Sequence, residues 1–216
     1  MFDPNQFSTE PVSFKDRDTW EDNSYKMLIP GTKCVGVIDN LDHGREWTRE
    51  GKTYMGVAVT LRSTQPAGVV ANGYLNSQPR TWGNKSSALE DLVQASGMEF
   101  DGNLTNQSIA EMIAEIYRDQ TPVGFDITWR GYCNSLFETT LMDLTETNSI
   151  DEAKTIATTE QTKEARRAAE FKAPQFKVNG QYKSTITCDQ TGQDVRARYE
   201  IRNILVADDV DEQLGG

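Results

Sequence analysis

The sequence is poor in the residues on which catalytic and metal sites most often depend. Its single histidine, His43, lies in a turn-like segment, so any site that needs two imidazoles is excluded. The glycine-rich phosphate loop, the dinucleotide fingerprint, the serine-hydrolase elbow and the zinc-protease motif are also absent. Carboxylates are abundant but form no spaced pair that stands out. We therefore expect a binding protein rather than an enzyme, with no metal and no cofactor.

Long apolar runs are missing as well. No segment approaches the roughly 18 apolar residues that a membrane span requires. The first ten residues, MFDPNQFSTE, have neither the basic nor the apolar stretch of a signal peptide. The 3 cysteines are too few and too far apart for a secreted disulfide scaffold. These features predict a cytoplasmic protein with reduced thiols and no membrane contact.

Basic residues are fewer than acidic ones, with 22 Lys and Arg against 33 Asp and Glu, so the net charge of the chain is -11. This argues against a uniform cationic coat on nucleic acid, which would gain its affinity by replacing counterions. Acidic residues gather at the ends, within the first 25 residues and at Asp208, Asp209, Asp211 and Glu212. We expect a flexible N-terminal arm over residues 1–25, a domain over 26–206, and an acidic tail over 207–216.

The patterns that are present are mainly those of β-strands. Between residues 54 and 62, Met55, Val57, Val59 and Leu61 alternate with polar or small residues, and 122–133 alternates in the same way. Gly73 is expected to mark a bulge in its strand. Strands are predicted at 32–39, within 45–62, at 68–76, at 122–133 and at 195–206. Within 45–62 the residues EGK (50–52) mark a turn, and Arg45, Trp47, Arg49 and Lys52 are expected in the loop before the strand.

Helical patterns separate the third and fourth of these strands. Ser86 or Ser87 can cap a helix that stops at Gly97, and Asn106 or Ser108 can cap a second one. Residues 134–190 look like an insertion, with a helix at 150–171 and a hairpin around an Asn-Gly turn. The prediction is a mainly β fold with helices (α+β), in the element order of the OB-fold, a five-stranded partly open barrel.

Two cysteines flank the insertion in a suggestive way. Cys133 and Cys188 occupy the places where a zinc ribbon has its two C-x-x-C turns, but Leu136 and Thr191 stand where the second cysteines would be. The insertion is either a ribbon that has lost its metal and keeps its shape by packing Leu136 and Phe137, or it contains two unrelated buried cysteines. Neither interpretation predicts bound zinc.

An OB-like barrel with a ribbon-like insertion before its last strand and an acidic C-terminal tail resembles the single-stranded DNA-binding proteins that tailed phages encode. The resemblance covers residues 30–216 as an arrangement of elements. The chain departs from it at the missing cysteines and at its end, Leu214-Gly215-Gly216, where many such tails carry a bulky aromatic residue. The resemblance implies sequence-tolerant binding of single-stranded DNA during replication and recombination in the host cytoplasm. It also implies a tail that competes with DNA or contacts replication proteins.

Binding of single strands needs cations for phosphates and flat rings for stacked bases. Trp129 alternates with core residues and is expected to be buried, whereas Trp47 and Trp82 are either core residues or stacking platforms. The alternative function is a virion structural or assembly protein, which would need no basic groove. The candidate DNA-binding residues are Arg45, Trp47, Arg49, Lys52, Tyr54, Arg62, Tyr74, Arg80, Trp82, Lys85, Arg196, Arg198 and Arg202.

Overall fold

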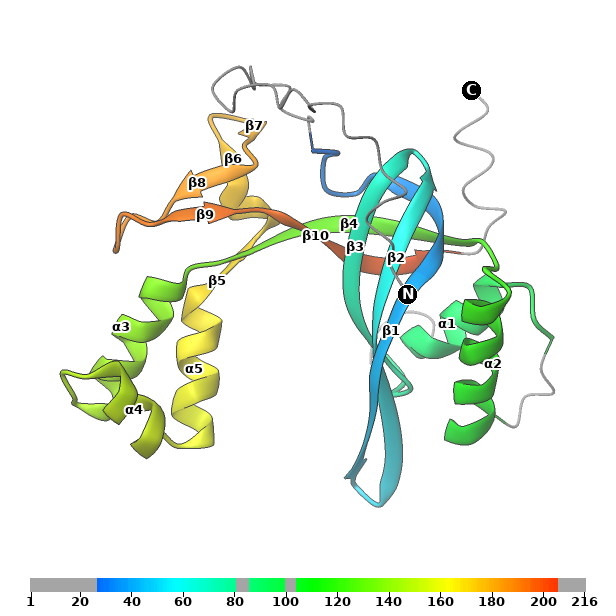
Figure 1. Cartoon of the computed structure of the whole chain (residues 1–216), viewed down its shortest axis with the longest axis horizontal. Helices are drawn as coiled ribbons and strands as arrows, with labels where there is room; N and C mark the ends of the chain where they lie inside the picture. The colour runs from blue at the N-terminus through cyan, green and yellow to red at the C-terminus, as the bar shows by residue number, and fades with distance from the viewer. Residues whose placement is uncertain (1–26, 81–85, 100–103, 206–216) are drawn as a thin grey trace, which may run out of the picture.

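The computed structural model describes residues 27–80, 86–99 and 104–205, and within them the chain is a mixed α/β protein with a large sheet (Figure 1). The predicted N-terminal arm and acidic tail, together with Trp82 and Lys85, lie outside the described residues. No helix in the described ranges has the length and apolar character needed to cross a membrane. The sheet has the strand order β1 (Lys33–Arg49), β2 (Lys52–Gln65), β3 (Ala67–Asn76), β10 (Arg198–Leu205), β4 (Val123–Tyr132) and β5 (Glu170–Lys172).

The first five strands of this order close into a ring. Residues 33–36 of β1 pair with β4, and residues 35–49 pair with β2, so that Val35 and Gly36 pair with both. All ring pairings are antiparallel except β3 with β10, which is parallel at Asn72 and Glu200. Gly36 is paired with both neighbours, so the backbone of β1 turns the corner of the ring at this residue.

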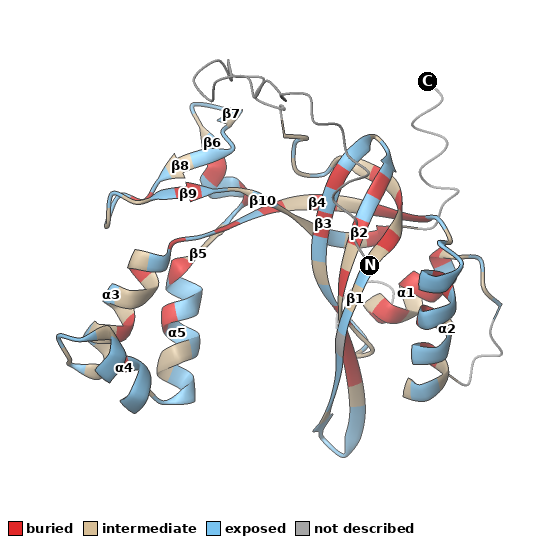
Figure 2. Cartoon of the chain, viewed as in Figure 1, coloured by how far each residue is buried: buried red, intermediate tan, exposed pale blue. Residues whose placement is uncertain are grey.

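The interior of the ring is the main hydrophobic core. The alternation predicted for β2 is confirmed, because Met55, Val57, Val59 and Leu61 are all buried, and Trp129 of β4 is buried as expected. Figure 2 shows the buried residues along the ring strands and on one side of α1 and α2. This packing leaves the alternate residues of each strand on the outer surface, where they can contact a partner.

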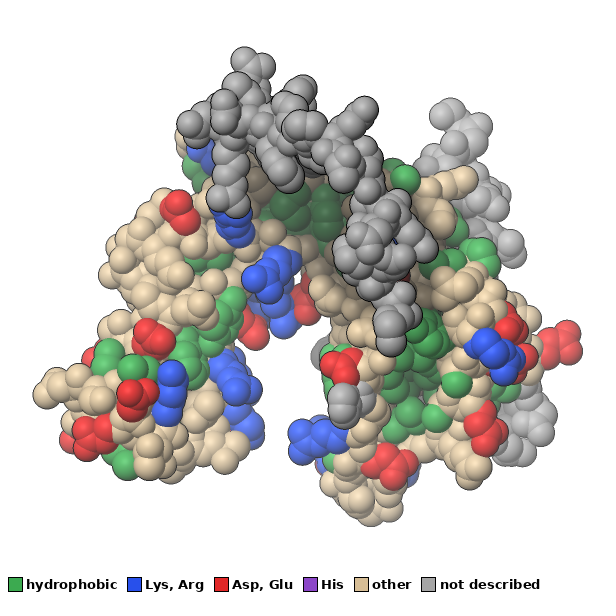
Figure 3. Space-filling model, in the orientation of Figure 1, with side chains coloured by type: hydrophobic (Ala, Val, Ile, Leu, Met, Phe, Trp, Pro, Cys, Tyr) green, Lys and Arg blue, Asp and Glu red, His purple; other side chains and the backbone are tan. Residues whose placement is uncertain are grey.

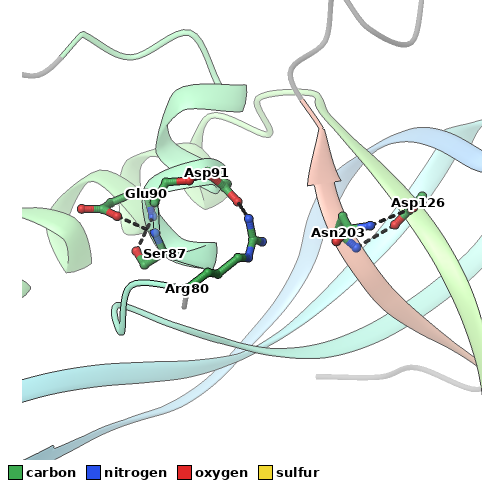
Figure 4. A network of polar contacts seen from close by, with 7 residues as sticks. Arg80, Ser87, Glu90, Asp91, Asp126 and Asn203 are labelled. Carbon is green, nitrogen blue, oxygen red and sulfur yellow. Dashed lines mark hydrogen bonds and ion pairs between the residues drawn. The ribbon is translucent and has the colours of Figure 1, made fainter. Parts of the chain in front are cut away.

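Helices α1 (Ala88–Ala95) and α2 (Asn106–Arg118) follow β3 and precede β4 in the sequence, and they pack against the ring. Ser87 caps α1 in a capping box with Glu90, and Arg80 pairs with Asp91 beside it (Figure 4). The cap of α2 is Thr105, one residue before the earlier of the two predicted caps. Thr105 is the cap because its side chain accepts a hydrogen bond from the backbone N–H of Ser108, and the Ser108 side chain accepts one from the backbone N–H of Thr105.

The first strand is much longer than predicted. We expected it to end at residue 39 and expected Arg45, Trp47, Arg49 and Lys52 to lie in a loop, but the strand runs to Arg49 and Lys52 begins β2. The two strands are joined by Glu50 and Gly51, which both have positive φ, as the tightest hairpin turns require. The polar composition of residues 40–49 hid the strand, because this part of the hairpin projects from the ring and has little to bury.

The predicted bulge at Gly73 is wrong, because β3 pairs with β2 without a register shift at this residue. The glycine has a packing role instead. A Cβ atom at position 73 would lie 3.0 Å from two side-chain atoms of Ile201 on β10. The missing side chain therefore lets β10 pack closely beside β3.

The insertion before the last strand forms two parts rather than the single helix and hairpin that we expected. Helices α3 (Asn134–Thr145), α4 (Ile150–Ile156) and α5 (Thr159–Ala169) form a small bundle, here called the helical arm. The predicted helix 150–171 is broken because Thr158 starts a new helix in a capping box with Gln161. Figure 1 shows the helical arm on the opposite side of the molecule from α1 and α2.

The second part is a set of short strands with a small core of its own, here called the ribbon. It comprises η3 (Ala173–Phe176), β6 (Lys177–Val178), β7 (Gln181–Tyr182), β8 (Thr185–Thr187) and β9 (Asp194–Arg196). The predicted Asn-Gly turn joins β6 to β7, and both turn residues have positive φ. The predicted last strand is split at Ala197, which donates its N–H to Ser184 of the ribbon, so β9 pairs with β8 while β10 joins the ring.

Candidate nucleic-acid interface

A cleft of about 610 Å³ lies where the ring meets the ribbon and the helical arm. The antiparallel strands β4 and β10 leave the ring side by side, and the outer side of their ends forms the floor of the cleft. The cleft is lined by Asn72 of β3, residues 130–132 of β4, Asn134 of α3, Glu170 of β5, Asp194 and Arg196 of β9, and residues 198–200 of β10.

Three arginines supply the positive charge of the cleft. Arg130 is neutralised by Glu200, at 2.8 Å between Nε and Oε2, and by Glu170, at 3.6 Å between Nη1 and Oε1. Arg196 and Arg198 form no ion pair with any residue that the structure describes. Both are exposed, so two uncompensated cations are available to an anionic ligand at this point.

Glu200 is the most perturbed acid of the cleft. Partial burial raises the pKa of its carboxyl group and the neighbouring Glu170 raises it further, while Arg130 opposes the rise. The carboxylate thus sits in a place that disfavours its negative charge. An anionic ligand in the cleft would add to this repulsion.

Tyr132 forms an aromatic wall at the edge of the cleft. Its side chain is exposed, and its ring lies 6.2 Å from the ring of Phe137 on α3, centroid to centroid. Burial raises the pKa of the Tyr132 hydroxyl, and Arg166 of α5 opposes this shift from nearby. A flat ring and three arginines therefore surround one opening, which is the combination that single-stranded nucleic acid requires.

A shallower groove of about 330 Å³ continues from the cleft across the outer side of β1, β2 and β3. Asn72 and Glu200 line both hollows, so the two are continuous. Thr60 donates a hydrogen bond of 2.8 Å to the side-chain oxygen of Asn72, which leaves the amide N–H groups of Asn72 as donors toward a ligand. Tyr74 lies over Gly56, where no side chain obstructs it, and remains exposed.

The same outer side extends along the β1–β2 hairpin. Residues directly opposite in an antiparallel pair share a face of the sheet. Trp47 is opposite Tyr54, and their rings lie 6.1 Å apart at an angle of 37°. Arg45 is opposite Gly56, and Arg49 is opposite Lys52. Seven predicted residues therefore lie on one face of β1–β2–β3: Arg45, Trp47, Arg49, Lys52, Tyr54, Arg62 and Tyr74.

Among the other predicted arginines, two are held in ion pairs and two line the cleft. Arg62 lies on this face but is paired with Asp39 at 2.6 Å, and Arg80 is paired with Asp91 at 2.5 Å near the start of α1. Arg196 and Arg198 lie in the cleft, whereas Arg202 is exposed on β10 without lining it. These ion pairs reduce the charge that Arg62 and Arg80 can offer to phosphates.

Sequence reasoning missed most of the cleft lining, including Arg130, Tyr132, Asn134, Asn72 and Glu200, and it missed Arg166 near Tyr132. The first two had a usable signal, since Arg130 alternates with the buried residues of β4 and Tyr132 is two positions further on the same side. Asn134 and Arg166 had none, because Asn134 lies at the cleft and Arg166 lies near Tyr132 only through the folding of the helical arm.

Charged side chains of both signs gather around the gap on one face of the molecule (Figure 3). Figure 3 shows an open gap between the helical arm and the β1–β2 hairpin, with Lys and Arg side chains on both flanks and at its head. Acidic side chains are also visible in the same view at the head of the gap and on the hairpin side of it. The lining of the cleft is formally balanced, because Glu170, Asp194 and Glu200 lie beside Arg130, Arg196 and Arg198.

In the described ranges, no group of three or more His, Cys, Asp or Glu side chains is arranged to hold a metal ion. The interface is thus a surface of cations, amides and rings. Comparison of the chain with protein-family models, with curated proteins and with solved structures finds no match.

Proposed function

We propose that this protein binds single-stranded DNA without strong sequence preference, through the cleft and the outer face that continues from it. The observation that carries the proposal is the meeting of Arg196, Arg198 and Tyr132 at one open cleft, with both arginines free of ion pairs in the described residues. Phosphates would contact the arginines and a base would stack on the tyrosine.

The path beyond the cleft supports the same ligand. From Asn72 the strand would cross the groove over Tyr74 and reach the Trp47–Tyr54 pair on the hairpin. Rings thus recur along the path, and each ring stacks on any base, which gives affinity without sequence preference. A duplex offers no unstacked bases to these rings, so we expect it to bind more weakly.

The ring of strands supports an OB-fold-like interpretation of the domain. Its five strands, in the order β1-β2-β3-β10-β4 and closed by β4 with β1, are compatible with the five-stranded OB-like barrel for which the sequence order of the elements was predicted. The face of the second and third strands is where such domains commonly bind oligonucleotides. We propose that β2 and β3 serve the same purpose here, with no catalytic step and no cofactor.

The direct test is a titration of fluorescently labelled oligo-dT with the full chain, followed by anisotropy, with duplex DNA as competitor. We expect saturable binding at low salt and displacement by unlabelled oligo-dT but poorly by duplex. A chain that does not bind oligo-dT at low salt would reject the proposal and favour a virion structural or assembly role. Equal competition by duplex would reject stacking as the basis of recognition.

Replacement of Tyr132 by Ala is expected to weaken oligo-dT binding by about 1–3 kcal/mol, since one stacked base is lost. The side chain is exposed, so the free energy of unfolding should change little. Tyr117 on α2 is similarly exposed and far from the cleft, so Tyr117→Ala is the matched control. Equal affinities of the two variants in the same anisotropy titration would remove Tyr132 from the site.

Replacement of Glu200 by Gln is expected to tighten oligo-dT binding near neutral pH, because it removes a repelling charge and releases Arg130. The raised pKa of Glu200 gives the sign of the pH effect: protonation as the pH falls through this pKa should also tighten binding by the parent protein. This part of the pH dependence should be absent in the Gln variant. Titrations over a pH series check both statements, with Glu111→Gln on α2 as control; no gain in affinity would contradict them.

A further inference from the structure

The two turns that contain Cys133 and Cys188 face each other beside the cleft. The Cys133 sulfur lies 3.4 Å from the Thr191 hydroxyl oxygen and 3.3 Å from the side-chain oxygen of Gln193. The Ser135 hydroxyl oxygen lies 3.4 Å from the same sulfur. Position 191 is thus in contact with Cys133 across the two turns.

Both turns are tight. In the first, the carbonyl oxygen of Cys133 accepts a hydrogen bond of 3.1 Å from the N–H of Phe137 as α3 begins. In the second, the carbonyl oxygen of Cys188 accepts a hydrogen bond of 2.8 Å from Gly192, and Gly192 has a φ of 71°. Glycine is suited to this left-handed position, which closes the turn directly after position 191.

The region between the turns is dry. Cys133 and Cys188 are buried, and Leu136 packs in the same small core as both of them.

The Gln193 side chain ties the two turns together. Its carbonyl oxygen accepts hydrogen bonds from the N–H of Ser135 at 2.9 Å, from the Ser135 hydroxyl at 2.7 Å and from the Cys133 thiol. Gln193 itself belongs to the second turn, where its backbone oxygen accepts from the N–H of Cys188 at 2.8 Å. One amide group thus joins the two turns.

We propose that these turns form a latent tetrahedral metal site that lacks ligands only at positions 136 and 191. In the parent chain, the Gln193 side-chain amide holds the two turns together in place of a metal ion. Cysteines at 133, 136, 188 and 191 would present four thiolates with the spacing of structural zinc sites. The class of ligand is a thiophilic divalent cation such as Zn²⁺ or Co²⁺. The parent chain, which has only two thiols at this site, should hold no stoichiometric zinc.

The test uses the full chain with the double substitution L136C/T191C, loaded with Co²⁺ or Zn²⁺ alone. We expect one metal ion per chain by elemental analysis, and the visible absorption of tetrahedral thiolate-bound Co²⁺. Because metal binds the folded state, Zn²⁺ at 100 times its Kd should raise Tm by roughly 5 °C or more. A chelator should reverse this increase.

The matched control is N134C/Q190C, which adds two thiols to the same two turns at exposed positions. It should show neither the Co²⁺ spectrum nor the rise in Tm. Equal metal binding by the control would overturn the proposal, because any added thiols would then suffice. A folded double variant that binds no Co²⁺ would overturn it as well.

Two further variants cover the remaining outcomes. If the loss of buried Leu136 unfolds the double variant, T191C alone keeps the leucine and offers three thiols, and it must bind Co²⁺ for the proposal to stand. Gln193→Ala tests the joining role. It should lower Tm in the metal-free parent and lower it less in the zinc-loaded double variant, whereas an equal loss in both would contradict that role.

Discussion

Charge reversal of both Arg196 and Arg198 to Glu is expected to abolish oligo-dT binding at physiological salt. The two arginines are the cations of the cleft without an acidic partner in the described residues, so they are free to contact phosphates. Hydrogen bonds between charged groups contribute roughly 1.5–3 kcal/mol each, so the pair should account for at least about 100-fold in affinity. Anisotropy titrations measure the loss directly.

A neutral version of the same change isolates the electrostatic part. Replacement of both arginines by Gln should reduce the slope of log K against log salt by about 1.4, from about 0.7 per phosphate contact on single strands. The control for the charge reversal is R118E/K154E. Arg118 and Lys154 are exposed and lie outside the cleft, so this double reversal changes the net charge by the same amount as R196E/R198E. If this control loses as much affinity as the cleft variant, the effect is one of net charge and the cleft is not the site.

Replacement of Gly36 by Ala is expected to destabilise the fold strongly. At this residue β1 pairs with β2 and β4 at once, and a Cβ atom would collide with the backbone carbonyl of Arg62. Backbone atoms of a paired strand cannot yield as a flexible side chain can. Forced overpacking of this kind costs about 3 kcal/mol, which corresponds to a decrease in Tm of roughly 6–12 °C for a chain of this size.

Gly44 provides the control for this prediction. It lies on the same strand, but a Cβ atom there would meet nothing within 4 Å. Gly44→Ala should therefore leave Tm nearly unchanged in thermal unfolding followed by circular dichroism. If Gly36→Ala were as stable as Gly44→Ala, β1 would not turn the corner of the ring at Gly36.

The parts of the fold that were predictable from the sequence are those governed by local rules. The buried set Met55, Val57, Val59 and Leu61 follows from a period of two, and helix α1 follows from a serine cap and a terminal glycine. The hairpin turn at Asn179-Gly180 follows from its dipeptide. Each of these signals lies within a few residues of the feature that it predicts.

The helical arm shows where local rules fail. Helix α3 begins at Asn134 without a side-chain hydrogen bond at its cap, and only Leu136 and Leu141 on it are buried. Its sequence therefore carries neither a clear start signal nor a strong apolar stripe. The helix is held by contacts with α4 and α5, through the buried residues Leu141, Ala153 and Ala165.

The cleft was only half predictable for a similar reason. The alternation of residues 195–202 placed Arg196 and Arg198 on an outer face, but nothing local indicated that Tyr132 would lie beside them. That neighbourhood depends on the long-range pairing of β10 with β4, which sets Arg198 opposite Arg130. Likewise, Arg62 is neutralised by Asp39 and Arg80 by Asp91. The two residues of each pair become neighbours only in the folded chain.

Photocrosslinking tests the central claim most directly, because it reports which residues touch DNA. Oligo-dT that contains 4-thiothymidine would be bound to the full chain at low salt, irradiated, and the crosslinked peptides identified by mass spectrometry. The account predicts adducts in the segment around Tyr132 and in residues 194–200, with further adducts around Trp47 and Tyr54. Adducts confined to α1, α2 or the outer side of the helical arm, or a lack of any adduct, would contradict it.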